Sequence, residues 1–278
     1  VVDLFCGCGG MSLGFQNAGY DIVAAFDNWK PAVRTYQKNF SHPVRQEDLA
    51  DEHMIPIISD LHPDIIIGGP PCQDFSSAGH RDESLGRATL SKIYTDIVTT
   101  AKPKYFVMEN VPRIRVSKTY QYVLNELKKA GYGVTEKIID ASYCGVPQKR
   151  KRLFLIGCQG AVDDFLSVEL DSHLSKKPMT IYDYLGDSLG VEYYFRIPRS
   201  YNRRAIFSIY EPCQTIRGVD RPIPPNYKRH PQDPVDIGPL VRALTPKERS
   251  YMQTFPEKFI FEENKTNTNQ MIGNADPV

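Results

Sequence analysis

The 278-residue sequence has no long apolar run, few cysteines and no excess of charge of either sign. No segment approaches the roughly 18 apolar residues that a membrane-spanning helix requires, which excludes a spanning protein. Six cysteines are too few for a disulfide framework at this length, so we expect free thiols in a reducing compartment. No basic-then-apolar leader precedes the first strand-like residues, and the abrupt start at Val1 indicates that a few upstream residues are missing.

Charge is nearly balanced over the whole chain but not along it. The chain has 34 basic and 33 acidic residues, which give a net charge of +1. The segment 195–230, in contrast, contains eight basic residues against two acidic ones, with tyrosines and a phenylalanine between them. Such a stretch is either a solvated surface or a face that binds a polyanion, and its composition favours the polyanion.

Apolar runs in the first 157 residues indicate alternating strands and helices. The expected strands are residues 1–5, 21–25, 64–67, 105–108 and 153–156, and the expected helices include 11–18 and 117–130. Ser117 and Gly131 are the expected start and stop signals of the second of these helices. The alternation predicts an α/β fold with a doubly wound, mostly parallel sheet, whose ligands lie at the carboxyl ends of the strands.

After Gly157 the pattern changes, because prolines become frequent and helical periodicity is not visible again until about Thr245. We therefore expect a smaller, loop-rich second domain over about residues 158–257. The last segment, from about residue 258 to 278, is expected to return to the first domain. The larger domain would then comprise residues 1–157 together with about 258–278.

A strand followed by closely spaced glycines stands at the N-terminus, in the sequence DLFCGCGG of residues 3–10. Such glycines let the backbone approach a ligand and present N–H groups at a helix start. The dinucleotide pattern G-x-G-x-x-G is not met, because Ser12 occupies the third glycine position. Asp27 follows Gly7 by 20 residues, the spacing at which a carboxylate binds ribose hydroxyls. We therefore expect a nucleoside-containing cofactor other than nicotinamide, and no metal at the two unaccompanied cysteines of this segment.

A cysteine preceded by two prolines follows the third expected strand, in the sequence GPPCQDFS of residues 69–76. The prolines stiffen the exit of the strand and present Cys72 at the carboxyl edge of the sheet. A lone cysteine is usually a small buried hydrophobic residue, but one that follows Pro-Pro and precedes polar residues is better explained as a nucleophile.

Two further polar elements lie beside expected strands. Glu109-Asn110-Val111-Pro112 follows the fourth strand; a Glu-Asn pair is often only a capped turn, but this carboxylate could meet the same ligand. The sequence QKRKR of residues 148–152 precedes the last strand. Four consecutive cations normally face solvent, whereas cations at the mouth of a sheet suit a phosphate backbone.

These four elements, in this order, resemble the DNA cytosine-5 methyltransferases, of the type found in bacterial restriction–modification systems. The resemblance covers essentially the whole chain and continues through RALTPKE at 242–248, QTFP at 253–256 and GNA at 273–275. Glycine loops alone are weak evidence, but Pro-Pro-Cys-Gln, Glu-Asn-Val and Gln-x-Arg-x-Arg in succession are specific. The resemblance implies a Rossmann-like methyltransferase domain that uses S-adenosylmethionine, joined to a smaller target-recognition domain.

The resemblance implies a cofactor site around the glycine turn, without a metal, from which S-adenosylhomocysteine is the product. The corresponding cofactor-binding residues are Phe5, Gly7, Gly9, Gly10, Asp27, Asn28, Asp48, Leu49, Pro70 and Asn274. Asp27 corresponds to the ribose-binding acid. Trp29 stands one place after Asn28, the position where some members stack a tryptophan on adenine. Asp276 departs from the family, which usually has an apolar residue after Gly-Asn-Ala.

The resemblance also implies the chemistry. The catalytic residues would be Cys72, Glu109, Asn110 and Arg152, and the DNA contacts would include Gln73, Ser76, Arg150, Arg203, Arg204 and Arg217. Cys72 corresponds to the nucleophile that bonds to C6 of cytosine, Glu109 to the catalytic acid, and Arg152 to the arginine that holds the target base. Because C6 is covered by stacked neighbours in a duplex, the base must be flipped out. Residues 76–90 are expected to form a mobile loop that closes over it.

The implied partner is double-stranded DNA, with a restriction endonuclease as a functional partner and no membrane. We expect a monomer, cytoplasmic in a bacterium and nuclear if the source is eukaryotic. Two alternatives share these residues, namely a tRNA cytosine-5 methyltransferase of the same fold and a non-catalytic DNA-binding relative. An amino-methylating enzyme is disfavoured, since it would carry Asp/Asn-Pro-Pro-aromatic where this chain has Pro70-Pro71-Cys72.

Overall fold

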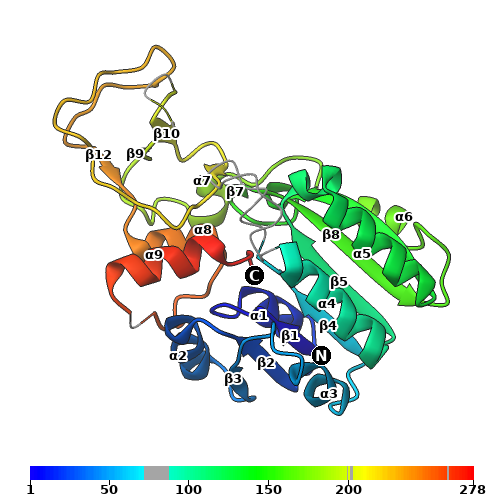
Figure 1. Ribbon diagram of the computed structural model, residues 1–278. Coiled ribbons are helices and arrows are strands. Elements are labelled where there is room, and N and C mark those ends of the chain that lie inside the picture. The colour runs from blue at the N-terminus through cyan, green and yellow to red at the C-terminus, as the bar shows by residue number, and fades with distance from the viewer. Residues whose placement is uncertain (72–87, 199, 201–202, 262) are drawn as a thin grey trace. The chain divides into compact units, whose positions relative to one another are not determined.

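The computed structural model describes residues 1–71, 88–198, 200, 203–261 and 263–278 (Figure 1). Contacts group the chain into two compact units. Unit 1 comprises Val1–Ile139 and Lys151–His173, and unit 2 comprises Asp140–Arg150 and Leu174–Val278. The sequence-based division assigns residues from about 258 onward to the larger domain, whereas their contacts lie in unit 2. Because grouping by contacts and division by function are different criteria, the functional boundaries remain a prediction.

Unit 1 is built on a seven-stranded sheet in the order β3-β2-β1-β4-β5-β8-β6. Each neighbouring pair from β3 to β5 is parallel, and β8 is antiparallel to β5. The strands are β1 (Val2–Leu4), β2 (Ala24–Asp27), β3 (Val44–Gln46), β4 (Ile65–Gly68), β5 (Tyr105–Asn110), β6 (Tyr132–Asp140) and β8 (Lys151–Gln159). The helices are α1 (Gly10–Asn17), α2 (Lys30–Asn39), α3 (Met54–Ser59), α4 (Ala88–Ala101), α5 (Lys118–Lys129) and α6 (Ser167–Ser172), with a 3-10 turn η2 (Pro112–Val116). The predicted α/β fold with a mostly parallel sheet is confirmed.

The core of unit 1 lies between this sheet and the helices that follow its strands. Val2, Leu4, Ile66 and Ile67 are fully buried, as expected for central parallel strands covered on both faces. Side chains of α3, α4 and α5 belong to the same apolar cluster. Helices α4 and α5 lie side by side in Figure 1. This packing holds the central strands rigidly, so that their carboxyl ends form a fixed edge.

Helix α5 forms where the sequence predicts it. The Ser117 hydroxyl caps it by accepting a hydrogen bond from the Tyr120 N–H at 3.0 Å. Tyr120, Val123 and Leu127 then bury one face of the helix. Gly131 follows with φ of 90°, a left-handed conformation that suits glycine and ends the helix.

Unit 2 contains short elements joined by long connections. A three-stranded sheet has the order β10-β9-β12, and a two-stranded parallel sheet pairs β11 with β7. The strands are β7 (Gln148–Lys149), β9 (Tyr193–Phe195), β10 (Ile206–Ser208), β11 (Cys213–Gln214) and β12 (Val241–Ala243). The helices are α7 (Ile181–Leu185), α8 (Pro246–Met252) and α9 (Lys265–Asn274), with a 3-10 turn η3 (Ala141–Tyr143). In the described part of the chain, no helix has the length and apolar character needed to cross a membrane.

Several expected boundaries were wrong. Strand β2 begins three residues later than expected and ends at Asp27, so this carboxylate is the last residue of the strand. Helical structure appears before Thr245, in α6 and α7. Helices this short span too few turns to show periodicity in the sequence. The sequence signal of α7 is its Thr180–Asp183 capping box. The expected loop at residues 76–90 ends in helix, since α4 begins at Ala88, and the rest of that loop lies outside the described residues.

Candidate functional site

The carboxyl ends of the parallel strands β1, β2, β4 and β5 lie at one edge of the sheet in unit 1. The register pairs Leu4 with both Phe26 and Gly68, and Gly68 with Met108. The residues at or just beyond these ends therefore gather along a single edge. They include the glycine turn, Asp27, the Gly69-Pro70-Pro71 segment and Glu109, which are separated by up to about a hundred residues in the sequence.

The glycine turn after β1 has an unusual backbone. Phe5, Gly7 and Gly9 have φ of 59°, 54° and 95°, and for the bulky Phe5 this conformation is strained. A Cβ at Gly7 would meet nothing within 4 Å, so the backbone there borders open space. A Cβ at Gly9 would lie 2.4 Å from the Phe40 ring and 2.9 Å from the Tyr36 ring. Packing against α2 therefore requires glycine at position 9, while the open face at Gly7 could accept a ligand.

A chain of hydrogen-bonded side chains connects the residues on either side of this turn with α2. Ser12 donates to Asp3 Oδ2 at 2.5 Å, and Tyr36 donates to the Ser12 hydroxyl at 2.6 Å. The Tyr36 hydroxyl also lies 2.6 Å from His42 Nε2. Since a carboxylate only accepts hydrogen bonds, donation runs toward Asp3, and the His42 Nε2 must be the donor to Tyr36. The hydrogen bonds of Ser12 could not be predicted from the sequence, because only folding brings Tyr36 on α2 next to Ser12 on α1.

Asp27 links the turn to the next strand. Its Oδ2 accepts a hydrogen bond from the Gly7 N–H, and its Oδ1 accepts one from the Trp29 N–H, each at 2.8 Å. Burial raises the pKa of Asp27 above its usual range, although these two hydrogen bonds oppose that effect. Each carboxylate oxygen retains a second acceptor site, so Asp27 can hold the turn and still bind hydroxyl groups of a ligand.

Glu109 and Arg152 form an ion pair at the same edge. Their strands β5 and β8 are antiparallel neighbours, with Glu109 opposite Phe154, and Arg152 Nε lies 2.7 Å from Glu109 Oε1. The side chains are 12% and 18% exposed, so the pair is largely shielded but reachable. A Cβ at Gly69 would stand 2.9 Å from Glu109 Oε2, so a larger residue there would require the carboxylate to shift. The sequence analysis expects Glu109 and Arg152 at the same site but does not predict that they form an ion pair.

Asn110 fixes the segment that leads to Cys72. It is 2% exposed, and its side-chain amide donates to the Pro70 carbonyl at 3.1 Å while its Oδ1 accepts from the Val111 N–H at 2.9 Å. Asn110 therefore positions the backbone of Pro70, and its expected catalytic role stays a prediction. Cys72, Gln73 and Ser76 lie outside the described residues.

The remaining expected cofactor residues differ in their surroundings. Leu49 is buried in the apolar core of unit 1, and its expected contact with the cofactor stays a prediction. Asp48 and Asn28 are exposed near the strand edge. Asn274 ends α9 in unit 2, where its Oδ1 accepts a hydrogen bond from the Gln270 side chain at 2.9 Å.

Arg150, which the sequence analysis assigns to DNA contact, is buried within unit 2, and that assignment stays a prediction. It is 2% exposed, and its guanidinium donates to the Gly273 and Ile216 carbonyls at 3.3 and 3.5 Å. Asp276 Oδ1 lies 3.9 Å from the same guanidinium, which gives this departure from the family pattern a local partner. Arg150 therefore ties together segments within unit 2.

The other expected DNA-contacting arginines are arranged differently. Arg203 is exposed. Arg204 pairs with Glu211 and stacks 4.2 Å from the centre of the Phe207 ring. The Arg217 guanidinium donates to the Ile197 carbonyl at 2.6 Å.

The two cysteines of the glycine turn are buried. Burial raises the pKa of the Cys6 thiol, and it raises that of the Cys8 thiol to about 12. Over the ranges that the structure describes, no three His, Cys, Asp or Glu side chains gather as a metal site.

Asp233 organises a loop of unit 2 for which the sequence carries no signal. Its Oδ1 accepts from the Ala205 and Ile206 N–H groups at 2.9 and 3.0 Å, and its Oδ2 accepts from the Tyr227 hydroxyl at 2.6 Å and the His230 N–H at 2.8 Å. Burial favours a higher pKa for Asp233, but these hydrogen bonds outweigh it and hold the pKa below its usual value. The carboxylate thus attaches the loop to β10.

We expect Asp233→Asn to destabilise the protein by about 1–3 kcal/mol at pH 7, because an amide cannot accept all four hydrogen bonds. A lowered folded-state pKa means that the carboxylate stabilises the fold above its unfolded pKa of about 4 and loses this effect as the pH falls through the folded value. Urea unfolding at pH 7 and pH 3 should therefore show a smaller difference from wild type at pH 3. The exposed Asp236→Asn is the control. An equal cost at both pH values would contradict this role of the charge.

Comparison with known proteins gives consistent matches over the whole chain. The family model described as C-5 cytosine-specific DNA methylase matches residues 1–278. The Type II methyltransferase M.HindV of Haemophilus influenzae is 55% identical over 279 aligned residues, covering 100% of this chain and 92% of the relative. The Type II methyltransferase M.HgiDI of Herpetosiphon aurantiacus is 53% identical over 280 residues, covering 100% and 90%.

Solved structures show the same fold at low identity. The S. pombe Dnmt2 methyltransferase has a TM-score of 0.75 at 16% identity, over 99% of this chain and 93% of that chain. The Entamoeba histolytica methyltransferase EhMeth has a TM-score of 0.70 at 20% identity, over 99% and 93%.

Proposed function

Because the chain belongs to the C-5 cytosine-specific DNA methylase family, we propose that it transfers a methyl group from S-adenosylmethionine to C5 of a cytosine within a specific sequence of double-stranded DNA. The observation that carries this proposal is the Glu109–Arg152 pair at the carboxyl edge of the sheet, 2.7 Å apart. It lies where Asn110 holds Pro70, two residues before Cys72.

The proposed reaction begins with Cys72. Cytosine C5 is too electron-poor to attack a methyl donor, and addition of a thiolate to C6 makes C5 nucleophilic. The Cys72 thiol releases its proton to water, its sulfur bonds to C6, and the C5–C6 π electrons shift toward N3, where the Glu109 carboxyl donates a hydrogen bond. C5 then takes the methyl group. Water removes the C5 proton, the C5–C6 double bond re-forms as the C6–S bond breaks, and the sulfur leaves as thiolate. S-adenosylmethionine, when bound, supplies the electrophilic methyl group and leaves as S-adenosylhomocysteine.

Glu109 and Arg152 stabilise the charge that this addition creates. Electron density moves toward N3 of the ring, where the Glu109 carboxyl hydrogen-bonds N3 and the exocyclic amine. Arg152 donates to Glu109 and holds it in one orientation, while its remaining N–H groups are suited to the base carbonyl.

The glycine turn fits the adenosyl part of the cofactor. The open face at Gly7 allows close approach to the backbone, and the Asp27 carboxylate beside it accepts hydrogen bonds from the ribose hydroxyls. Phe5 follows β1 in a strained backbone conformation, and its ring stacks against the adenine in this proposal. The buried hydroxyl chain from His42 to Asp3 keeps the turn in place.

We expect Asp27→Asn to weaken S-adenosylmethionine binding by about 10- to 100-fold. Both carboxylate oxygens accept backbone N–H groups, so the amide nitrogen of the variant must face either Gly7 or Trp29 with donor against donor. Isothermal titration calorimetry measures the effect directly, with the exposed Asp60→Asn as control. An unchanged dissociation constant would remove Asp27 from the cofactor site.

The names of the relatives extend the proposal to the setting of the enzyme. M.HindV and M.HgiDI are described as Type II methyltransferases. We propose that this chain likewise works beside a restriction endonuclease that cuts the same sequence, as a monomer in a bacterial cytoplasm.

The decisive test is to express the protein in cells that lack cytosine methylation and to map 5-methylcytosine in both DNA and tRNA. Methylation of one recurring DNA sequence supports the proposal. Methylation confined to tRNA would show that tRNA is the substrate. If neither DNA nor tRNA contained 5-methylcytosine, the protein would be a non-catalytic relative. Covalent capture on a duplex containing 5-fluorocytosine separates a catalytic protein from a binding one.

A further inference from the structure

Three cations of unit 1 lie at the carboxyl edge of the sheet, near the Glu109–Arg152 pair. Arg113 belongs to η2, which follows β5, Lys118 is the first residue of α5, and Lys151 is the first residue of β8. All three side chains are exposed. We call these three residues the basic rim.

The strand register brings the rim together over one face of the sheet. Because β8 is antiparallel to β5, its first residues lie beside the carboxyl end of β5. Side chains alternate between the two faces along a strand, so Lys151 is on the same face as Leu153. Leu153 belongs to one buried apolar cluster with Ile114 of η2 and Tyr120 of α5. Lys151 therefore lies on the face that η2 and α5 cover, and these two elements carry the other cations of the rim.

Carboxylates do not offset the charges of the rim. In the described part of the chain, none of its three side chains forms an ion pair or a hydrogen bond. The other cations of η2, α5 and β6 all have a carboxylate partner within 2.6–2.7 Å, in the pairs Arg115–Glu136, Lys128–Asp163, Lys129–Glu126 and Lys137–Asp171. The unpaired positive charge of these elements is therefore concentrated at the carboxyl edge of the sheet.

Lys118 occupies a position that is unfavourable for the stability of α5. It directly follows the capping residue Ser117, and the first turn of the helix contains no acidic residue. The amino end of a helix carries a partial positive charge, so a cation there destabilises the helix. Because a neutral or acidic residue would avoid this cost, the lysine is better explained by an anion that it binds than by the fold.

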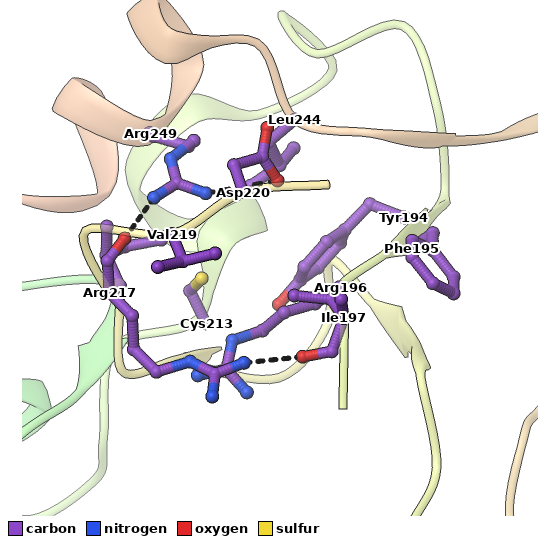
Figure 2. A pocket seen from close by; sticks show the side chains of 11 residues that line it. Tyr194, Phe195, Arg196, Ile197, Cys213, Arg217, Val219, Asp220, Leu244 and Arg249 are labelled. Carbon is purple, nitrogen blue, oxygen red and sulfur yellow. Dashed lines mark hydrogen bonds and ion pairs between the residues drawn. The ribbon is translucent and has the colours of Figure 1, made fainter. Parts of the chain in front are cut away.

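Several arginines of unit 2 make contacts within the fold instead. The Arg217 guanidinium donates to the Ile197 carbonyl at 2.6 Å, and the Arg217 carbonyl accepts a hydrogen bond from Arg249 (Figure 2). Arg249 Nη1 also lies 3.2 Å from Asp220 Oδ1. These side chains are held by protein groups, whereas those of the rim extend into solvent.

We propose that Arg113, Lys118 and Lys151 bind phosphodiester groups of the DNA backbone close to the target cytosine. This inference rests on the proposed function and adds backbone contacts made by unit 1, the unit that carries Glu109 and Arg152. Exposed lysine and arginine side chains neutralise phosphates without reading the bases. Flipping a base out of the duplex costs free energy, and phosphate contacts beside the flipped nucleotide offset part of that cost.

The test compares Arg113→Gln, Lys118→Gln and Lys151→Gln with wild type by fluorescence anisotropy on two duplexes, one with the methylated sequence and one with it scrambled. Each variant should bind both duplexes roughly 3- to 10-fold more weakly, by the same factor. The slope of log binding constant against log salt should become shallower by about 0.9 for each substitution, the value for one phosphate. Lys102→Gln removes an exposed cation just before β5, at the opposite edge of the sheet, and should leave the slope unaltered.

Further variants separate the charge from the fold. Arg113→Lys and Lys151→Arg keep the positive charge and should retain the wild-type slope. Lys118→Gln should melt no lower than wild type, because it removes a cation from the amino end of α5. Glutamine variants with the same slope as Lys102→Gln would overturn the proposal. A loss of affinity confined to the methylated sequence would also overturn it, since the contacts would then be to bases.

Replacing one phosphate at a time by an uncharged methylphosphonate locates the contacts. Neutralising phosphates close to the target cytosine should weaken binding by wild type and have little effect on the triple glutamine variant. If every position weakens both proteins equally, the proposal is wrong. Failure of the proposed function would look different, since wild type itself would then form no covalent adduct with 5-fluorocytosine DNA.

Discussion

Cys72→Ala is expected to lower methyl transfer by about 10⁴-fold or more while cofactor affinity stays within a few-fold of wild type. The thiol takes part only in the reacting state, so its removal affects kcat rather than ground-state binding. Transfer of labelled methyl groups to DNA measures the first quantity, and calorimetry with S-adenosylhomocysteine measures the second. Cys72→Ser is the matched variant, since it keeps the size and polarity of the side chain but replaces the thiol by a much weaker nucleophile.

The same variants test the covalent step. Wild type should form a stable adduct with 5-fluorocytosine DNA, and peptide mass spectrometry should place the linkage on Cys72. Cys144 is an exposed free cysteine and is therefore the natural control, with Cys144→Ala expected to form the adduct normally. Turnover in Cys72→Ala, or an adduct on another residue, would contradict the assignment.

Glu109→Gln is expected to lower kcat by about 10²- to 10⁴-fold. The amide is not an acid, so it stabilises the negative charge that develops at N3 of the cytosine less well than the carboxyl group does. The variant also leaves Arg152 beside a neutral group in a shielded position. Arg152→Met should lower activity as well, since Glu109 then loses the partner at 2.7 Å that holds it in place.

The two residues should behave as a unit. In the double variant Glu109→Gln/Arg152→Met we expect a loss no greater than that of the worse single variant, which is the non-additivity of groups that act together. Single-turnover kinetics at saturating DNA measures this coupling. Fully additive losses would show that the ion pair is structural and that the residues contribute independently. Lys128→Met, which breaks an exposed ion pair with Asp163, is the control for removing a cation.

The predictions that needed only local sequence were the most accurate. Ser117 and Gly131 mark the ends of one helix through bonds to residues three positions away, so local sequence contains the whole interaction. The motif order likewise identified the family, because each motif is contiguous. Short elements such as α6 and α7 were missed since they depend on packing more than on a periodic pattern.

The family resemblance gave Arg150 and Arg152 different roles, but the local chemistry of the run does not show which contacts each side chain makes. They stand two residues apart in one run of cations, and local chemistry gives them the same affinity for phosphate. In the fold, Arg152 enters β8 and reaches Glu109 on the neighbouring antiparallel strand, whereas Arg150 lies before β8 and is buried among carbonyl groups of unit 2. Strand register and burial separate them, and both depend on residues far along the chain.

The amino-acid sequence alone determined the family, the α/β architecture and the strand ends that carry the polar residues, since these follow from contiguous motifs and from apolar periodicity. Only the tertiary structure decided which charges meet. The Glu109–Arg152 pair, the hydrogen-bonded hydroxyls of Ser12 and Tyr36, and the bonds of Asp233 to β10 join segments that are distant in sequence. The stabilisation that these contacts provide depends on burial and on the relative positions of their groups, and both exist only in the folded chain.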